Sequence, residues 1–119
     1  ELTIGIGPFV ILPAVERKIG LANASQLSID ARSWYDSRWA AKAGLFQGVF
    51  EDQNSLDEAV DTLAESLASY SSDATAQLKK ALWQGTDHWD ELLAQRAEVS
   101  GQLVLGEAAR QALAEIKGK

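Results

Sequence analysis

Apolar side chains recur at intervals of three and four residues in the second half of the chain, and polar side chains fill the positions between them. The first of these stripes consists of Leu56, Val60, Leu63, Leu67 and Tyr70. This spacing places the apolar side chains on one face of an amphipathic helix. Ser55 followed by Glu58 matches a capping box, so we expect this helix to begin at Ser55.

Further helices are predicted after a polar break at residues 71–73. Gly85 is expected to end the first of them, and Thr86 or Asp87 to cap the next, because Gly is favoured after a helix and Thr or Asp before one. The predicted ranges are 74–83, a stretch from Trp89 toward Gly106, and 108–117.

The first twelve residues are β-branched and rich in Gly. We expect a loop or short extended piece here, followed by a turn into a helix that begins near Pro13, since Pro is favoured at the first helical position. Gly20 is expected to end that helix, and residues 22–29 continue as a helix.

A shorter helix is predicted over residues 37–43, with Asp36 as its N-cap and Gly44 as its C-cap. Residues 45–50 alternate in polarity as a short strand would. The fold class is therefore mainly α, with a short extended N-terminal segment followed by about six helices.

Composition restricts the functions that this chain can perform. Its 119 residues are 46% hydrophobic and 24% charged, which is typical of one globular domain that buries roughly two-thirds of its unfolded surface. A net charge of −6 argues against binding to nucleic acid or to an anionic membrane, since both need clustered Lys and Arg. The absence of Cys excludes disulfides and thiolate chemistry, and one His cannot build a multi-histidine zinc site, so we expect no metal.

Two features of the ends bear on location and completeness. The longest apolar stretch, residues 8–15, is far shorter than the ~20 residues of a membrane span, and no signal-peptide pattern is present, so we expect a cytoplasmic protein. The sequence contains no Met and begins at Glu1, inside a motif. We therefore expect an internal piece of a longer protein.

Several stretches resemble, in the same order, the C-terminal half of the crotonase superfamily, which contains the enoyl-CoA hydratases and isomerases. Residues 1–8 (ELTIGIGP) are similar to the family's Pro-Glu-x-x-x-Gly-x-x-Pro motif, and residues 17–20 (RKIG) to its Arg-x-x-Gly helix ending. The remaining pieces are residues 26–31 with 39–45, which lead to Val49-Phe50, and residues 63–79, which resemble the paired helices of the family's oligomerisation region.

The resemblance implies the C-terminal part of a crotonase-like, spiral ββα fold. Residues 1–54 would be the end of the spiral core and residues 55–119 the helical oligomerisation region, with no linker between them. Phe9-Val-Ile-Leu stands where the family usually has Gly-Ala-Gly-Gly. Members that resemble methylglutaconyl-CoA hydratase also lack these glycines, so the chain looks most similar to them. The family's N-terminal half supplies the backbone oxyanion hole, most coenzyme A contacts and the other catalytic Glu, and these 119 residues do not contain it.

The resemblance also assigns site residues. Glu1 would be a catalytic carboxylate in fatty-acid metabolism, exchanging protons with water and the α-carbon of an enoyl-CoA. The other assignments are Gly5, Gly7, Pro8 and Phe9 to the acyl pocket, and Lys117 and Lys119 to coenzyme A. No cofactor is implied beyond coenzyme A as part of the substrate. The structural alternatives are a charged terminus at Glu1, a plain backbone turn at residues 5–9, and helix-end cations that stabilise the helix dipole.

Aromatic residues are numerous, and they indicate a core or an interface more than a ligand platform. The apolar residues of the last helices exceed what one thin helical layer can bury, so we expect a homo-oligomer, and the resemblance implies a trimer or a trimer-based assembly. Three hypotheses follow. The chain is part of a lyase or isomerase acting on acyl-CoA and is inactive alone, or it is a helical module for self-association or partner binding without catalysis, or it is an unrelated helical protein.

Overall fold

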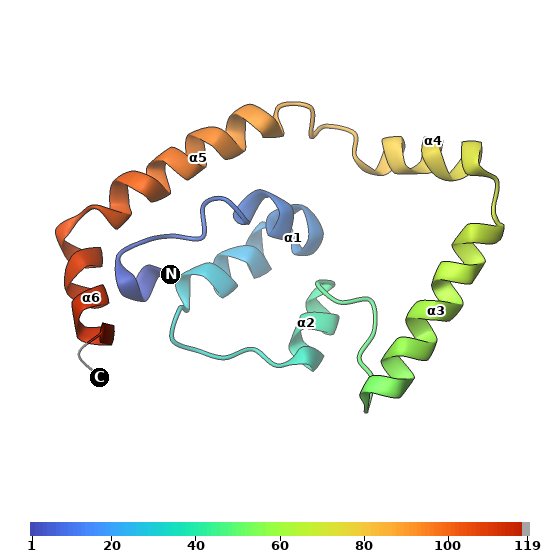
Figure 1. Ribbon diagram of the computed structural model, residues 1–119, viewed down its shortest axis with the longest axis horizontal. Helices are drawn as coiled ribbons and strands as arrows, with labels where there is room; N and C mark the ends of the chain where they lie inside the picture. Colours follow the sequence, from blue (N-terminus) through green and yellow to red (C-terminus); the bar gives the residue numbers. More distant parts are fainter. Residues whose placement is uncertain (118–119) are drawn as a thin grey trace. The chain divides into compact units, whose positions relative to one another are not determined.

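The computed structural model describes residues 1–117, and within them the chain is mainly helical, with no β-strand (Figure 1). The elements are the 3₁₀-helix η1 (Leu2–Ile4) and the α-helices α1 (Leu12–Ile29), α2 (Ser37–Ala43), α3 (Gln53–Ser69), α4 (Ser72–Leu82), α5 (Trp89–Val104) and α6 (Glu107–Lys117). This confirms the predicted mainly α class. None of these helices is both long enough and apolar enough to cross a lipid bilayer.

The contacts of the chain divide it into two compact units. Unit 1 comprises residues 1–47 and 90–119, and unit 2 comprises residues 48–89. Unit 1 therefore brings the N-terminal segment, α1 and α2 together with α5 and α6, which come from the other end of the sequence. The division at residue 54 concerns the architecture of the resembled family and stays a prediction.

Gly20 interrupts α1 where the sequence predicted a helix end. Its φ of 75° and ψ of 160° lie outside the helical region, in a conformation that is essentially restricted to Gly. Helical structure resumes after it, and the side-chain amide of Asn23 donates a hydrogen bond of 2.9 Å to the carbonyl of Ile19 across the break. Two helical pieces joined at Gly20 are therefore confirmed, and Pro13 lies in the first turn as expected.

Local capping defines both ends of α2. The Asp36 carboxylate accepts a hydrogen bond of 2.7 Å from the backbone N–H of Trp39, which satisfies a donor that the first helical turn leaves free. Gly44 follows the helix with a φ of 89° and a ψ of 9°, the left-handed conformation of a C-cap. Both predicted caps are confirmed.

The strand predicted over residues 45–50 is wrong, and of the two alternatives for the first residues, a loop or a short extended piece, the structure shows a loop that begins with a 3₁₀-helix. Residues 2–4 form η1, in which the N–H of Ile4 donates to the carbonyl of Glu1, and Gly5 reverses the chain with a φ of 77°. Residues 45–50 are irregular, because the N–H groups of Leu45 and Phe46 both donate back to the carbonyl of Ala40. A strand needs a neighbour to pair with, and the described residues offer none.

The start of α3 is also corrected. Asp52, three residues before the predicted Ser55, is the N-cap, and its carboxylate accepts hydrogen bonds of 2.8 Å from both the backbone N–H and the hydroxyl of Ser55. A carboxylate is a stronger acceptor than a hydroxyl and is favoured at the positive end of the helix dipole. These hydrogen bonds, the one from the backbone of Ser55 above all, lower the pKa of Asp52 below its ordinary value.

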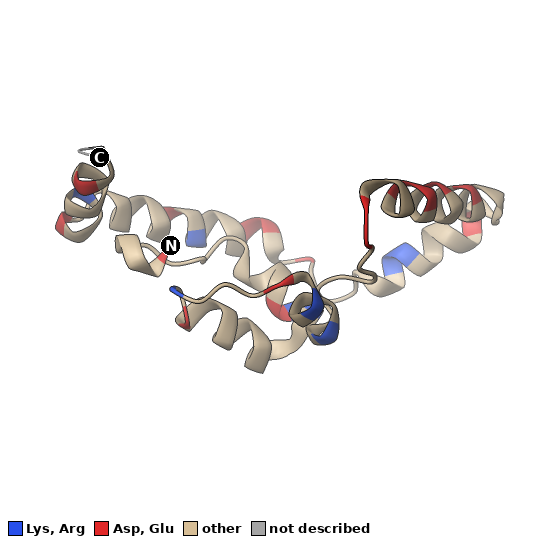
Figure 2. Cartoon of the chain, turned by 90° about the horizontal axis from the view of Figure 1, so that it is seen from below, with Lys and Arg blue, Asp and Glu red and all other residues tan. Residues whose placement is uncertain are grey.

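Few side chains of the described residues are buried, and the two units differ in this respect. The buried apolar side chains all belong to unit 1: Pro13, Ile19, Ala24, Ala40 and Ala109. Neither α3 nor α4 buries any residue. The side chains of the α3 stripe are between 38% and 61% exposed. Its polar positions carry Asp and Glu but no Lys or Arg, as the red bands along this helix show (Figure 2).

Candidate functional site

The N-terminal segment, residues 1–11, forms a compact loop that contains most of the residues assigned from the sequence. Glu1 precedes η1, and its carbonyl accepts hydrogen bonds from the N–H groups of Ile4, at 3.0 Å, and Ile6, at 3.2 Å. The carbonyl of Pro8 accepts a hydrogen bond of 3.0 Å from the N–H of Leu12 and so joins the segment to α1. These local hydrogen bonds place residues 1–9 in one folded loop.

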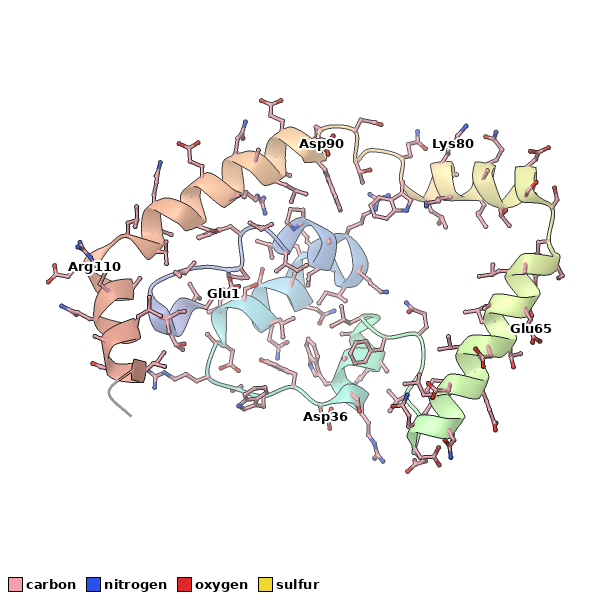
Figure 3. All side chains as sticks on the ribbon, in the orientation of Figure 1. Glu1, Asp36, Glu65, Lys80, Asp90 and Arg110 are labelled. Atoms are coloured by element: carbon pink, nitrogen blue, oxygen red, sulfur yellow. The ribbon has the colours of Figure 1, made fainter. Side chains whose placement is uncertain are left out.

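Glu1 is exposed at the start of this loop (Figure 3). Its side chain makes no hydrogen bond that caps η1. The carboxylate is therefore free to face solvent or a ligand. Its position is compatible with the catalytic assignment and equally with a charged terminus.

Gly7 and Phe9 form the tightest part of the loop. Gly7 is buried, and a Cβ atom placed on it would lie 2.6 Å from Cζ of the Phe9 ring. No real Cβ makes so close a contact, so the ring lies directly against the backbone at Gly7. Within the described chain, Phe9 is half-buried against its own loop, and Pro8 is also half-buried.

A shallow depression of about 260 Å³ lies beside the start of the loop. It is lined by Leu2, Thr3, Ile29, Asp30, Ala31 and Arg32. None of the residues predicted to form an acyl pocket lines it. The depression lies between η1 and the C-terminal end of α1, and its lining includes the charged side chains of Asp30 and Arg32.

Asp30 has a hydrogen-bond partner that the sequence analysis did not identify. The hydroxyl of Tyr35 donates to the Asp30 carboxylate at 2.9 Å. Hydrogen bonds from the side chains of Ser33 and then Tyr35 lower the pKa of Asp30. Partial desolvation, followed by the hydrogen bond to Asp30, raises the pKa of Tyr35. The hydrogen bond therefore favours the ionised form of Asp30, and the short sequence separation of Asp30 and Tyr35 was the signal that could have revealed the pair.

The aromatic residues do not form a common platform. The rings of Tyr35 and Trp39 lie 4.4 Å apart in unit 1, and those of Trp83 and Trp89 lie 5.9 Å apart, edge to face, in unit 2. Trp34 is 99% exposed. Trp34 therefore does not belong to a core made by the described residues.

The structure does not describe the side chains of the two lysines that the resemblance assigns to coenzyme A. Lys117 is the last residue of α6, its side chain is outside the described part of the structure, and Lys119 lies outside the described residues. Among the residues that are described, no group of three or more His, Cys, Asp or Glu side chains could hold a metal ion. The site is thus a loop with one free carboxylate.

No family model, curated protein or solved structure matches this chain.

Sequence reasoning also missed Arg96. It occupies a position in the apolar period of α5, between Leu93 and Val99, and a cation at such a position signals a polar contact on the covered face of a helix. The structure shows that contact: Nη1 of Arg96 donates to the carbonyl of Phe9 at 3.2 Å.

Proposed function

We propose that this chain is the C-terminal part of an enoyl-CoA hydratase/isomerase-type protein. The parent protein adds water to an enoyl-CoA thioester, or shifts its double bond, by carboxylate acid–base chemistry with Glu1 as one carboxylate. The oxyanion donors come from polypeptide outside this chain. The resemblance of residues 1–79 supplies the chemistry.

The structural observation that supports this proposal is the uncovered apolar face of unit 2. A half-exposed Leu or Val forgoes about 1 kcal/mol of burial, so covering the α3 stripe is worth on the order of 5 kcal/mol. That amount is comparable with the whole stability of a small domain. Leu78 and Leu82 on α4 are also uncovered, since their side chains are 58% and 63% exposed. Within unit 2 these faces are therefore uncovered, and a larger enzyme would supply polypeptide to cover them.

The loop of residues 1–9 is consistent with the same proposal. A general acid or base must be held within hydrogen-bond reach of the substrate while its carboxylate stays free. Glu1 lies at the start of a folded loop, and its side chain is exposed. We expect hydration by the isolated chain to be absent, because loss of oxyanion donors costs orders of magnitude in rate.

The test compares the chain alone with the longer protein encoded by the same reading frame. Both are assayed for crotonyl-CoA hydration by the loss of enoyl-thioester absorbance. We expect turnover by the longer protein, its loss in Glu1→Gln, and normal turnover in Glu58→Gln, which changes an exposed carboxylate on α3. Normal turnover in Glu1→Gln contradicts the catalytic role, and no turnover by the unaltered longer protein contradicts the hydratase function.

A second function, self-association or partner binding without catalysis, is favoured by the same uncovered faces. In this case the chain alone forms oligomers whose mass is a multiple of 12.9 kDa. Light scattering on the purified chain tests for the oligomer, and the crotonyl-CoA assay of the longer protein distinguishes this function from the enzyme. Leu63→Asp, in the middle of the α3 stripe, abolishes the oligomer, while Glu65→Gln on the polar face of the same helix leaves it intact. A monomer at all concentrations contradicts the self-association form of this function.

A further inference from the structure

The N-terminal loop, residues 1–11, contacts two helices from the other end of the sequence, α5 and α6. The first of these contacts is the packing of η1 and Gly5 against α6 (Figure 1). A Cβ atom at Gly5 would lie 3.0 Å from Cβ of Ala108 and 3.1 Å from the backbone nitrogen of Ala109, which is fully buried. The backbone of α6 therefore lies directly against the start of the loop.

The second contact is the hydrogen bond from Arg96 on α5 to the carbonyl of Phe9, at the other end of the loop. The donor is one of the five N–H groups of the guanidinium. Hydrogen bonds that involve a charged group are about twice as strong as neutral ones. Arg96 is half-buried, which limits competition from water.

Contacts inside the loop link Phe9 to Glu1. The Phe9 ring lies against Gly7, and the N–H of the adjacent Ile6 donates to the carbonyl of Glu1. The Phe9 turn is thus connected, through Gly7 and Ile6, to the backbone of the residue that carries the candidate carboxylate.

We infer that Arg96 is a positioning residue that fixes the Phe9 turn and thereby the placement of Glu1. The expected effect of Arg96 on catalysis rests on the proposed function, whereas its effect on the placement of the Phe9 turn does not. A misplacement of about 1 Å at a reacting group can lower a rate by about 100-fold.

The structural test is amide hydrogen exchange measured by NMR on the 119-residue chain. In Arg96→Gln we expect the amides of Ile6 and Leu12 to exchange about 10-fold faster, as loss of one charge-assisted hydrogen bond predicts. Arg96→Lys, which keeps one charged donor, restores part of the protection. Arg110→Gln, an exposed arginine on α6 labelled in Figure 3, leaves it unchanged.

Unchanged exchange in Arg96→Gln overturns the inference. Equal acceleration throughout α5 also overturns it, because Arg96 would then merely stabilise its own helix. In the longer protein, Arg96→Gln is expected to lower kcat between 10- and 100-fold while KM stays within about twofold. If the unaltered protein hydrates no enoyl-CoA, the proposed function fails and the exchange result still decides on Arg96; if kcat is unchanged in an active enzyme, the inference alone fails.

Discussion

The contact between Gly5 and α6 can be tested with a pair of glycine-to-alanine substitutions. Gly5 and Gly44 both follow a helix in the left-handed conformation, with φ values of 77° and 89° and ψ values of 15° and 9°. They differ in their surroundings. A Cβ at Gly44 meets its nearest neighbour, the carbonyl oxygen of Lys18, at an ordinary 3.7 Å, whereas a Cβ at Gly5 lies 3.0 Å from Cβ of Ala108.

The magnitude follows from this difference. The left-handed conformation costs an alanine roughly 1–2 kcal/mol at either site. At Gly5 the added methyl group must also displace α6, since carbon atoms normally approach to about 3.5–4.0 Å. Overpacking of this kind costs about 1–3 kcal/mol. Gly5→Ala should therefore destabilise unit 1 by about 1–3 kcal/mol more than Gly44→Ala, a difference of about 5- to 150-fold in an opening equilibrium.

Hydrogen exchange and urea denaturation measure this difference. The extra loss of protection in Gly5→Ala is expected in α6, over residues 107–117, and at the loop amides of residues 4–6, with no excess over Gly44→Ala in α2. Equal destabilisation by the two substitutions would refute the close approach of η1 to α6. Excess exchange confined to α2 would refute it as well, since that helix does not touch Gly5.

Three further predictions follow from other parts of the chain. Because the pKa of Asp52 is lowered in the folded state, its stabilisation of α3 is present above the ordinary value of 3.8 and is lost as the pH falls through the lowered pKa; circular dichroism should show this acid loss of helix, and Asp52→Ala should reduce it. Trp34→Ala should change the free energy of unfolding, measured by urea denaturation, by less than about 0.5 kcal/mol, because the side chain is 99% exposed. A larger change would mean that Trp34 makes a contact within this chain. Tyr35→Phe should raise the pKa of Asp30 toward its ordinary value in an NMR titration, since it removes a donor to the carboxylate; an unchanged Asp30 titration would mean that the Tyr35 hydroxyl does not bind it in solution.

Local sequence determined most of the helices of this protein. Asp36 caps α2, Gly44 ends it and Gly20 interrupts α1 because each effect acts over four residues or fewer and depends on one side chain or one φ angle. The amphipathic pattern predicted α3 for the same reason, but its N-cap was predicted wrongly at Ser55, because the carboxylate of Asp52 caps the helix three residues earlier.

Tertiary contacts decided the features that the sequence did not reveal. Residues 45–50 have the alternation of a strand, but a strand forms only with a partner, and the N–H groups of Leu45 and Phe46 bond to the carbonyl of Ala40 in α2 instead. The place of the candidate site was decided in the same way. Gly5 and Gly7 predict a turn. Nothing near them in the sequence specifies that α6 packs against Gly5, or that Arg96 donates a hydrogen bond to the carbonyl of Phe9, which is 87 residues away. Such contacts depend on how whole helices pack, which short-range preferences do not determine.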